Sequence, residues 1–207
     1  MNLPSLDSIE TPAALVDVDR LETNLQKAAA YVREHGLRWR PHTKTHKVPE
    51  LAARQLQAGA LAEDVLLACS PVGASKLARL MALPRRVRLS VALDSREALA
   101  GLREAARASG RTVGVLVELD LGMRRVGVAS PELAVALARE LSEAEGLHYQ
   151  GVMFYRSHIR MPLAEQGPAL AEVSRRLGTF LEALGAAGLT PGVVSGCEWC
   201  PTMCASR

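Results

Sequence analysis

The residues of this sequence best suited to chemistry form a basic run at 40–47, Arg-Pro-His-Thr-Lys-Thr-His-Lys. Lys44 stands in its middle, between His42 and His46. Neighbouring cations and partial burial both disfavour the charged form of a lysine, which lowers its pKa and frees the amine as a nucleophile. The pattern is typical of a lysine that forms a Schiff base with a carbonyl compound.

Two other interpretations of the basic run remain open. The first is a solvated turn between a strand and a helix, which would carry the same charges without any chemistry. The second is a zinc site, because His42 and His46 would share one face if residues 43–45 were helical. The neighbouring sequence offers no third zinc ligand.

Short β-branched runs alternate with longer Ala-, Leu- and Arg-rich stretches, which predicts strands alternating with helices. The expected strands are 13–19, 37–41, 65–71, 87–94, 113–120, 148–155 and 192–196. The expected helices are 20–35, 47–58, 74–82, 95–109, 130–145 and 163–187. Such alternation indicates parallel βα units and favours an α/β fold of the (β/α) TIM-type barrel kind, with its chemistry at the carboxyl ends of the strands. The expected strand 37–41 would place Lys44 at that edge.

Composition excludes several functional classes. The chain has 207 residues, of which 48% are apolar and 23% charged, and its formal net charge of +3 does not indicate a nucleic acid or an anionic membrane as partner. No apolar run approaches the roughly 18–20 residues of a membrane helix, and the N-terminus lacks the features of a secretory signal. We therefore expect a cytoplasmic protein.

Further motifs accompany the basic run: TPAALVDVDRLETNL at 11–25, VELDLGMRRVGV at 117–128, GVMFYRSHIR at 151–160 and AAGLTPGVVSG at 186–196. With them the sequence resembles the D-threonine aldolase and D-serine dehydratase group. These enzymes belong with the alanine racemase N-terminal domain-like, fold-type III enzymes that use pyridoxal 5′-phosphate (PLP). The basic run and the D-x-G-x-x-R-x-G pattern from Asp120 to Gly127 are the most specific motifs.

The resemblance implies a role for three residues around the cofactor ring. Lys44 matches the lysine that forms the Schiff base with PLP, and Arg125 matches the arginine that reaches the phenolate side of the ring. A donor that is always charged would keep this phenolate ionised. His42 matches a histidine close to the cofactor.

Four more residues match family motifs near the cofactor. Tyr155 and His158 follow the sixth barrel strand, where ring contacts and acid–base groups are expected. Ser195 and Gly196 match the start of a turn that binds the phosphate through backbone N–H groups. The expected catalytic residues are thus Lys44, His42, Tyr155 and His158, and the expected cofactor ligands are Lys44, Arg125, Tyr155, Ser195 and Gly196.

The activity implied by the resemblance is a PLP-dependent lyase acting on D-β-hydroxy amino acids. An aldolase would break Cα–Cβ to give glycine and an aldehyde, whereas a D-serine dehydratase-like enzyme would give a keto acid and ammonia. A PLP-binding protein without activity is a further alternative. The family also implies a homodimer and a divalent metal that assists at the β-hydroxyl and is held by a C-terminal domain.

The sequence departs from the family in three places. One strand–helix unit expected after residues 57–60 is missing, and Ser-Gly-Cys-Glu-Trp-Cys at 195–200 replaces a turn of small residues. The last barrel strand and the C-terminal β domain with its metal ligands have no counterpart. We therefore expect an N-terminal segment at 1–19 with an orphan strand, a partial PLP-binding barrel at 20–207, and weak or absent activity.

The cysteines offer one more alternative, a metal-dependent barrel enzyme. Three of them have C-x2-C-x3-C spacing near the end of the sequence: Cys197, Cys200 and Cys204. Three thiolates without a fourth ligand make a weak case for zinc or a cluster, so we expect no metal site there. Cys69 falls within a predicted strand and is expected to be a buried core thiol.

Overall fold

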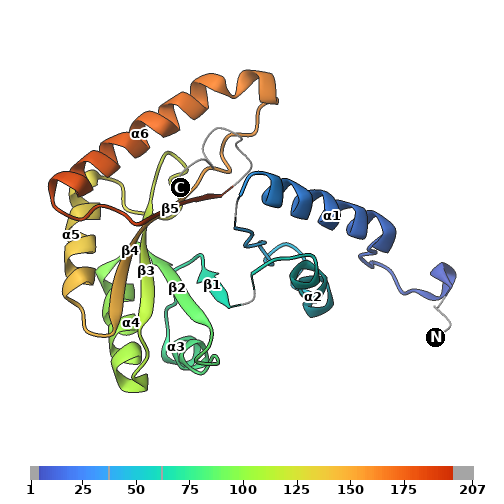
Figure 1. Ribbon diagram of the computed structural model, residues 1–207, viewed down its shortest axis with the longest axis horizontal. Helices are drawn as coiled ribbons and strands as arrows, with labels where there is room; N and C mark the ends of the chain where they lie inside the picture. The colour runs from blue at the N-terminus through green and yellow to red at the C-terminus, as the bar shows by residue number, and fades with distance from the viewer. Residues whose placement is uncertain (1–4, 37, 62, 198–207) are drawn as a thin grey trace. The chain divides into compact units, whose positions relative to one another are not determined.

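The structure is a computed structural model that describes residues 5–36, 38–61 and 63–197. It divides into two compact units, residues 1–61 and 62–207 (Figure 1). The first unit extends well beyond residue 19, where the sequence predicted that the barrel would begin. The predicted division of the chain at that residue stays a prediction.

The first unit contains helices α1 (Val18–Glu34) and α2 (Pro49–Gln57) and a 3-10 turn, η1 (Leu6–Ser8). The Asp17 carboxylate caps α1 by accepting a hydrogen bond from the backbone N–H of Arg20 at 3.0 Å. An ion pair between Arg54 and Glu22 joins the two helices. Both predicted helices of this unit are therefore confirmed.

The two strands predicted in the first unit are wrong. Residues 13–17 have no regular structure and α1 has begun by Val18, while 38–41 are irregular as well. A strand needs a partner for its backbone groups. The second segment does bond to another part of the chain, because the Leu61 N–H donates to the Trp39 carbonyl at 3.0 Å, but it joins no strand. Lys44 consequently lies in a turn over residues 43–46 and does not follow a strand.

The second unit is built on one parallel sheet with the strand order β1-β2-β3-β4-β5. These strands, each confirming a predicted one, are β1 (Asp64–Leu67), β2 (Arg88–Leu93), β3 (Val113–Leu119), β4 (Leu147–Tyr155) and β5 (Val193–Cys197). Each strand pairs with the next along the chain, as in the wall of a (β/α) barrel. The described sheet is thus an incomplete barrel. In the element order, β1 directly follows α2. The strand–helix unit that the family has between them is missing, as the sequence predicted.

The four predicted connecting helices are confirmed, although the last begins at Gly167 and not at residue 163 as predicted. They are α3 (Ala74–Met81), α4 (Arg96–Ser109), α5 (Pro131–Glu143) and α6 (Gly167–Ala186), with a 3-10 turn, η2 (Leu163–Glu165), before the last. Ser95 and Ser130 cap α4 and α5 by accepting backbone N–H groups, and Gly110 ends α4 in a left-handed conformation. None of the helices in the described ranges combines the length and apolar character needed to cross a membrane.

Alternation along the strands gives the sheet two different faces. On the outer face, side chains such as Val115, Val117 and Phe154 pack with α3 to α6 in the main hydrophobic core (Figure 1). On the inner face, Ala92, Leu116 and Met153 form a smaller apolar cluster. This small cluster is the floor beneath the carboxyl ends of the strands.

Arg111, which follows α4, binds the connection between α3 and β2 through hydrogen bonds. Its side chain is only 4% exposed, and its guanidinium donates to the backbone carbonyls of Leu83 and Val87, the latter at 2.6 Å. Further contacts reach Met81 and Pro84. A buried guanidinium is stable only when such acceptors replace water.

We predict that Arg111→Met lowers the free energy of unfolding by about 3 kcal/mol, because it leaves several buried carbonyls without a donor. Urea unfolding followed by circular dichroism measures the change. Arg103→Met, at an exposed position of α4, is the matched control and should change stability by less than about 0.5 kcal/mol. Equal stability of the two variants would contradict this role of Arg111.

Candidate functional site

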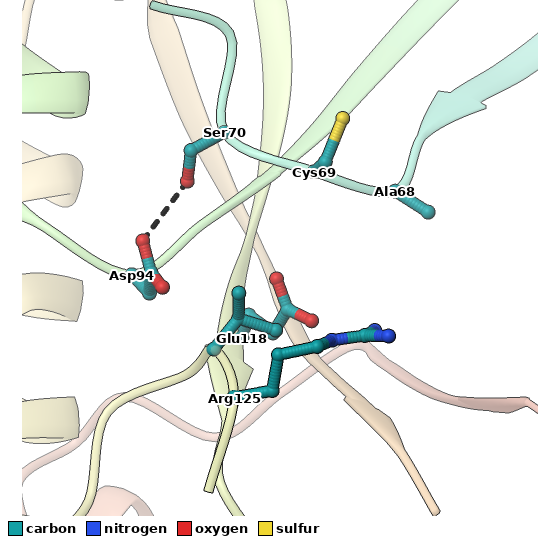
Figure 2. A pocket seen from close by; sticks show the side chains of 7 residues that line it. Ala68, Cys69, Ser70, Asp94, Glu118 and Arg125 are labelled. Carbon is teal, nitrogen blue, oxygen red and sulfur yellow. Dashed lines mark hydrogen bonds between the residues drawn. The ribbon is translucent and has the colours of Figure 1, made fainter. Parts of the chain in front are cut away.

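A cavity of about 330 Å³ opens at the carboxyl ends of β1, β2 and β3 (Figure 2). This is the edge at which barrel enzymes place their chemistry, and the volume lies in the range of small-molecule sites. The cavity is lined by Ala68, Cys69, Ser70, Asp94, Glu118, Arg125 and Val126. All of these residues belong to the second unit.

Asp94, directly after β2, connects three neighbouring strand ends. One carboxylate oxygen accepts the Ser70 hydroxyl at 3.0 Å, and the other accepts the backbone N–H of Gly127 at 3.0 Å. Ser70 follows β1, and Gly127 closes the loop after β3. These two hydrogen bonds hold the Asp94 carboxylate in place as an acceptor.

The D-x-G-x-x-R-x-G motif is a tight loop that begins at Asp120. A carboxylate oxygen of Asp120 accepts the backbone N–H groups of Gly122 at 2.9 Å and Arg124 at 3.0 Å. Gly127 has φ +100°, and a Cβ there would lie 2.6 Å from the backbone nitrogen of Asp120. Three of the four motif residues are therefore explained by the conformation of the loop.

The loop returns to the strand from which it started. The N–H of Val128 donates to the Glu118 carbonyl at 2.8 Å, and the N–H of Asp120 donates to the Val128 carbonyl at 3.0 Å. The fourth motif residue, Arg125, sits between these fixed points, and its side chain lines the cavity. The motif thus serves to deliver a guanidinium to the carboxyl end of the sheet.

Arg125 lies against Tyr155, the last residue of β4. The central carbon of the guanidinium is 5.3 Å from the centre of the tyrosine ring, a cation–π contact. The structure therefore brings together two of the residues that the resemblance assigns to the cofactor.

Glu118 lies on the floor of the same cavity, near the end of β3, and is 3% exposed. Burial, and secondly the negative charge of Asp94, raise the pKa of this carboxyl from 4.5 to about 7, although the positive charge of Arg125 opposes the rise. Near neutral pH the cavity therefore combines the Arg125 guanidinium with a buried carboxyl whose pKa is raised toward neutrality.

Of the remaining predicted residues in the second unit, His158 is exposed and its ring lies beside Gly122 at the start of the Arg125 loop. Ser195 and Gly196 lie within β5, paired with Met153 and Phe154. A Cβ on Gly196 would approach the Phe154 ring to 2.6 Å, so close packing already accounts for this glycine. Phosphate binding by Ser195 and Gly196 stays a prediction.

Lys44 and His42 belong to the first unit, where both are exposed. Partial burial, and secondly the charge of Lys44, lower the pKa of His42, which favours the neutral imidazole. Residues 43–45 form a turn and no helix, so the arrangement required by a His42–His46 zinc site is absent. The predicted roles of Lys44 and His42 toward the cofactor remain predictions.

Sequence reasoning missed Asp94, Glu118 and Ser70 as residues of the cavity. Their signal was present, because each stands at or just beyond the carboxyl end of a predicted strand. The prediction for Cys69 is wrong, since this residue is exposed at the cavity. The cause is the early end of β1 at Leu67, which leaves Cys69 in the following loop.

The structure leaves the cysteine-rich end of the sequence untested. The side chain of Cys197, and Cys200 and Cys204 entirely, lie outside the described residues, as does the acidic and aromatic replacement at 198–199. Within the described ranges, no three histidine, cysteine, aspartate or glutamate side chains gather in a group that could hold a metal ion.

Residues 16–198 match the family described as alanine racemase, N-terminal domain. The chain belongs to this family. A solved family relative with the same architecture is the D-threonine aldolase from Filomicrobium marinum, with 33% identity and a TM-score of 0.81 over 92% of this chain and 57% of that one. The alanine racemase of Streptomyces lavendulae, 21% identical with a TM-score of 0.54, shares the fold.

Curated relatives of the family match over almost the whole of this chain. A D-threonine aldolase of Arthrobacter sp. is 28% identical over 92% of this chain and 55% of its own length. A D-threo-3-hydroxyaspartate dehydratase of Delftia sp. is 32% identical over 98% of this chain and 59% of its own. The chain therefore spans somewhat more than half the length of these relatives.

The family uses PLP, and the Arg125 guanidinium in the cavity is a suitable donor for the oxyanion on the ring of that cofactor. Arg125 supplies a fixed positive charge for a ring oxyanion, and the Tyr155 ring supports the guanidinium. Glu118 can give up its negative charge by binding a proton, which limits repulsion of an anionic ligand. The cavity chemistry is thus compatible with the cofactor of the family.

We predict that the stability of the chain falls as pH rises from about 4.5 to about 7. In this interval the folded state binds a proton at Glu118 that the unfolded state has lost, so the slope is negative, by up to about 1.4 kcal/mol per pH unit. Above about pH 7 this contribution levels off. Urea unfolding across the interval measures it.

Two variants isolate the contribution of Glu118 to this slope. Glu118→Gln should flatten it, whereas Glu104→Gln, at an exposed position of α4, should leave it unchanged. The same slope in wild type and Glu118→Gln would show that Glu118 does not titrate in this interval.

Proposed function

We propose that this chain is the cofactor-binding part of a PLP-dependent lyase that acts on D-β-hydroxy amino acids. The main support is the Asp120–Gly127 loop, which fixes Arg125 at a cavity at the carboxyl end of an alanine racemase-type sheet. The aldolases among its relatives favour cleavage of Cα–Cβ to glycine and an aldehyde.

In this proposal Lys44 attaches the cofactor through its amine, and Arg125 holds the ring oxygen as an anion. Tyr155 keeps the guanidinium in place through its ring, and Ser195 and Gly196 would hold the phosphate. When bound, PLP draws electrons from the bond that breaks at Cα of the amino acid.

The proton transfers fall to two histidines in this scheme. His42, whose lowered pKa favours the neutral ring, can accept a proton near neutral pH. His158 stands beside the Arg125 loop, where it can exchange a proton with a substrate hydroxyl. By analogy with the family, a divalent metal and a second subunit complete the site.

Dehydration is the second candidate function, favoured by the hydroxyaspartate dehydratase of Delftia sp. among the relatives. In that reaction the β-hydroxyl leaves as water after the α-proton is removed, and hydrolysis then gives a keto acid and ammonia. Both reactions need the same lysine and the same arginine, so these residues do not distinguish them.

We predict that added PLP gives the purified chain a visible absorbance that Lys44→Ala abolishes, because that variant lacks the amine proposed to condense with the cofactor aldehyde. Lys27→Ala, at an exposed position of α1, is the control and should keep the absorbance. Identical spectra for wild type and Lys44→Ala would contradict the role of Lys44.

The products then separate the functions. Glycine released from D-threonine supports the aldolase, and a keto acid with ammonia from D-serine or a 3-hydroxy-D-aspartate supports the dehydratase. Lysine-dependent PLP binding without either product supports a PLP-binding protein without activity.

A further inference from the structure

The cavity contains a titratable group for which the proposed function has no use, the carboxyl of Glu118. It lies deeper than the other polar residues, at 3% exposure, and points toward Arg125 from the end of β3 (Figure 2). No carboxyl group is needed there to hold the loop, because only the backbone carbonyl of Glu118 is bonded to Val128.

The charged groups around Glu118 come from different elements. Asp94 approaches from the end of β2 with both oxygens occupied, by Ser70 after β1 and by the N–H of Gly127. Arg125 approaches from the loop after β3, with Tyr155 of β4 against its guanidinium. Asp94 and Arg125 are thus the two charges that compete at Glu118.

Asp94 and Glu118 are not equivalent in this arrangement. Asp94 is only partly buried and both of its oxygens accept hydrogen bonds, whereas Glu118 is buried, which disfavours its ionised form. A proton entering the cavity therefore resides on Glu118. Its ionised form depends on Arg125, the one positive charge among the residues that line the cavity.

An oxyanion bound at Arg125 would compete with Glu118 for that positive charge. We propose that Glu118 is a positioning residue that pairs with Arg125 in the empty cavity and takes up a proton when an oxyanion-bearing ligand binds. The proton passes from solvent to a carboxylate oxygen of Glu118. The Arg125 guanidinium then pairs with the oxyanion of the ligand in place of Glu118. Binding and protonation are then coupled, so each strengthens the other to the same extent.

The coupling has a quantitative consequence. If the bound oxyanion disfavours the ionised Glu118 by a factor of about ten, an effect expected of two like charges a few ångströms apart, binding near pH 7 takes up about 0.4 proton. The affinity of the wild type relative to a variant without this carboxylate then falls about fivefold by about pH 8 and approaches a tenfold loss only at higher pH.

The probe for this test is pyridoxine 5′-phosphate, which has an alcohol where PLP has an aldehyde and so cannot condense with a lysine. Calorimetry in buffers of different ionisation enthalpy measures the proton uptake. The probe can also change its own protonation on binding, and this contribution cancels when wild type is compared with Glu118→Gln. Glu104→Gln is the matched surface control.

We expect wild type and Glu118→Gln to bind the probe alike at about pH 5 and to differ about fivefold at about pH 8, with Glu118→Gln the tighter. Wild type and Glu104→Gln should take up about 0.4 proton more than Glu118→Gln near pH 7. Equal proton uptake by wild type and Glu118→Gln would overturn the proposal, and so would a folded chain that does not bind the probe.

A second measurement needs neither a ligand nor a variant of Glu118. In protein labelled with ¹³C at glutamate carboxyl groups, Arg125→Gln should raise the titration midpoint of Glu118, and Asp94→Asn should lower it. Unchanged midpoints in both would overturn the proposal. The role of Glu118 rests on the proposed function only for the choice of probe. If proton uptake at Glu118 is observed but the Lys44-dependent absorbance is not, the proposed function is refuted and the role of Glu118 stands.

Discussion

The cavity depends on the carboxylate of Asp94 and its two hydrogen bonds. Parallel strands end in separate loops, and nothing in the sheet itself ties these loops together. Asp94 does so by accepting the Ser70 hydroxyl from one side and the Gly127 N–H from the other. The loop that carries Arg125 is thereby fixed to the ends of the neighbouring strands. A guanidinium on a long, flexible side chain gains a defined position from this constraint.

The same carboxylate has an electrostatic consequence. Burial, and secondly the negative charge of Asp94, disfavour the loss of a proton from a second carboxyl nearby. That carboxyl belongs to Glu118, and Arg125 only partly offsets the effect. The cavity therefore combines one permanent positive charge with one negative charge that can be removed near neutral pH. Such a combination suits ligands that carry an oxyanion.

Membership of the alanine racemase N-terminal domain family explains why these groups lie at the carboxyl edge of the sheet. The relatives are aldolases and a dehydratase that are considerably longer than this chain. The motifs on which the resemblance rests are the basic run around Lys44, the loop around Arg125 and the strand that ends at Tyr155. The first of these lies in a different compact unit from the other two. The chemistry we propose therefore requires both units.

The sequence by itself determined the alternation of helices and strands in the second unit, because the signals for it act over a few residues. These signals are the periodicity of hydrophobic residues, helix caps such as Ser95 and Ser130, and glycines such as Gly110. It also identified Arg125 through its motif. The two strands expected before residue 42 failed because a strand is stable only beside a partner, which no local pattern can supply. Only the tertiary structure decided that Asp94 and Glu118 share a cavity with Arg125 and that Cys69 is exposed. Those facts depend on which strand ends meet and on where β1 stops, and residues distant in the sequence set both.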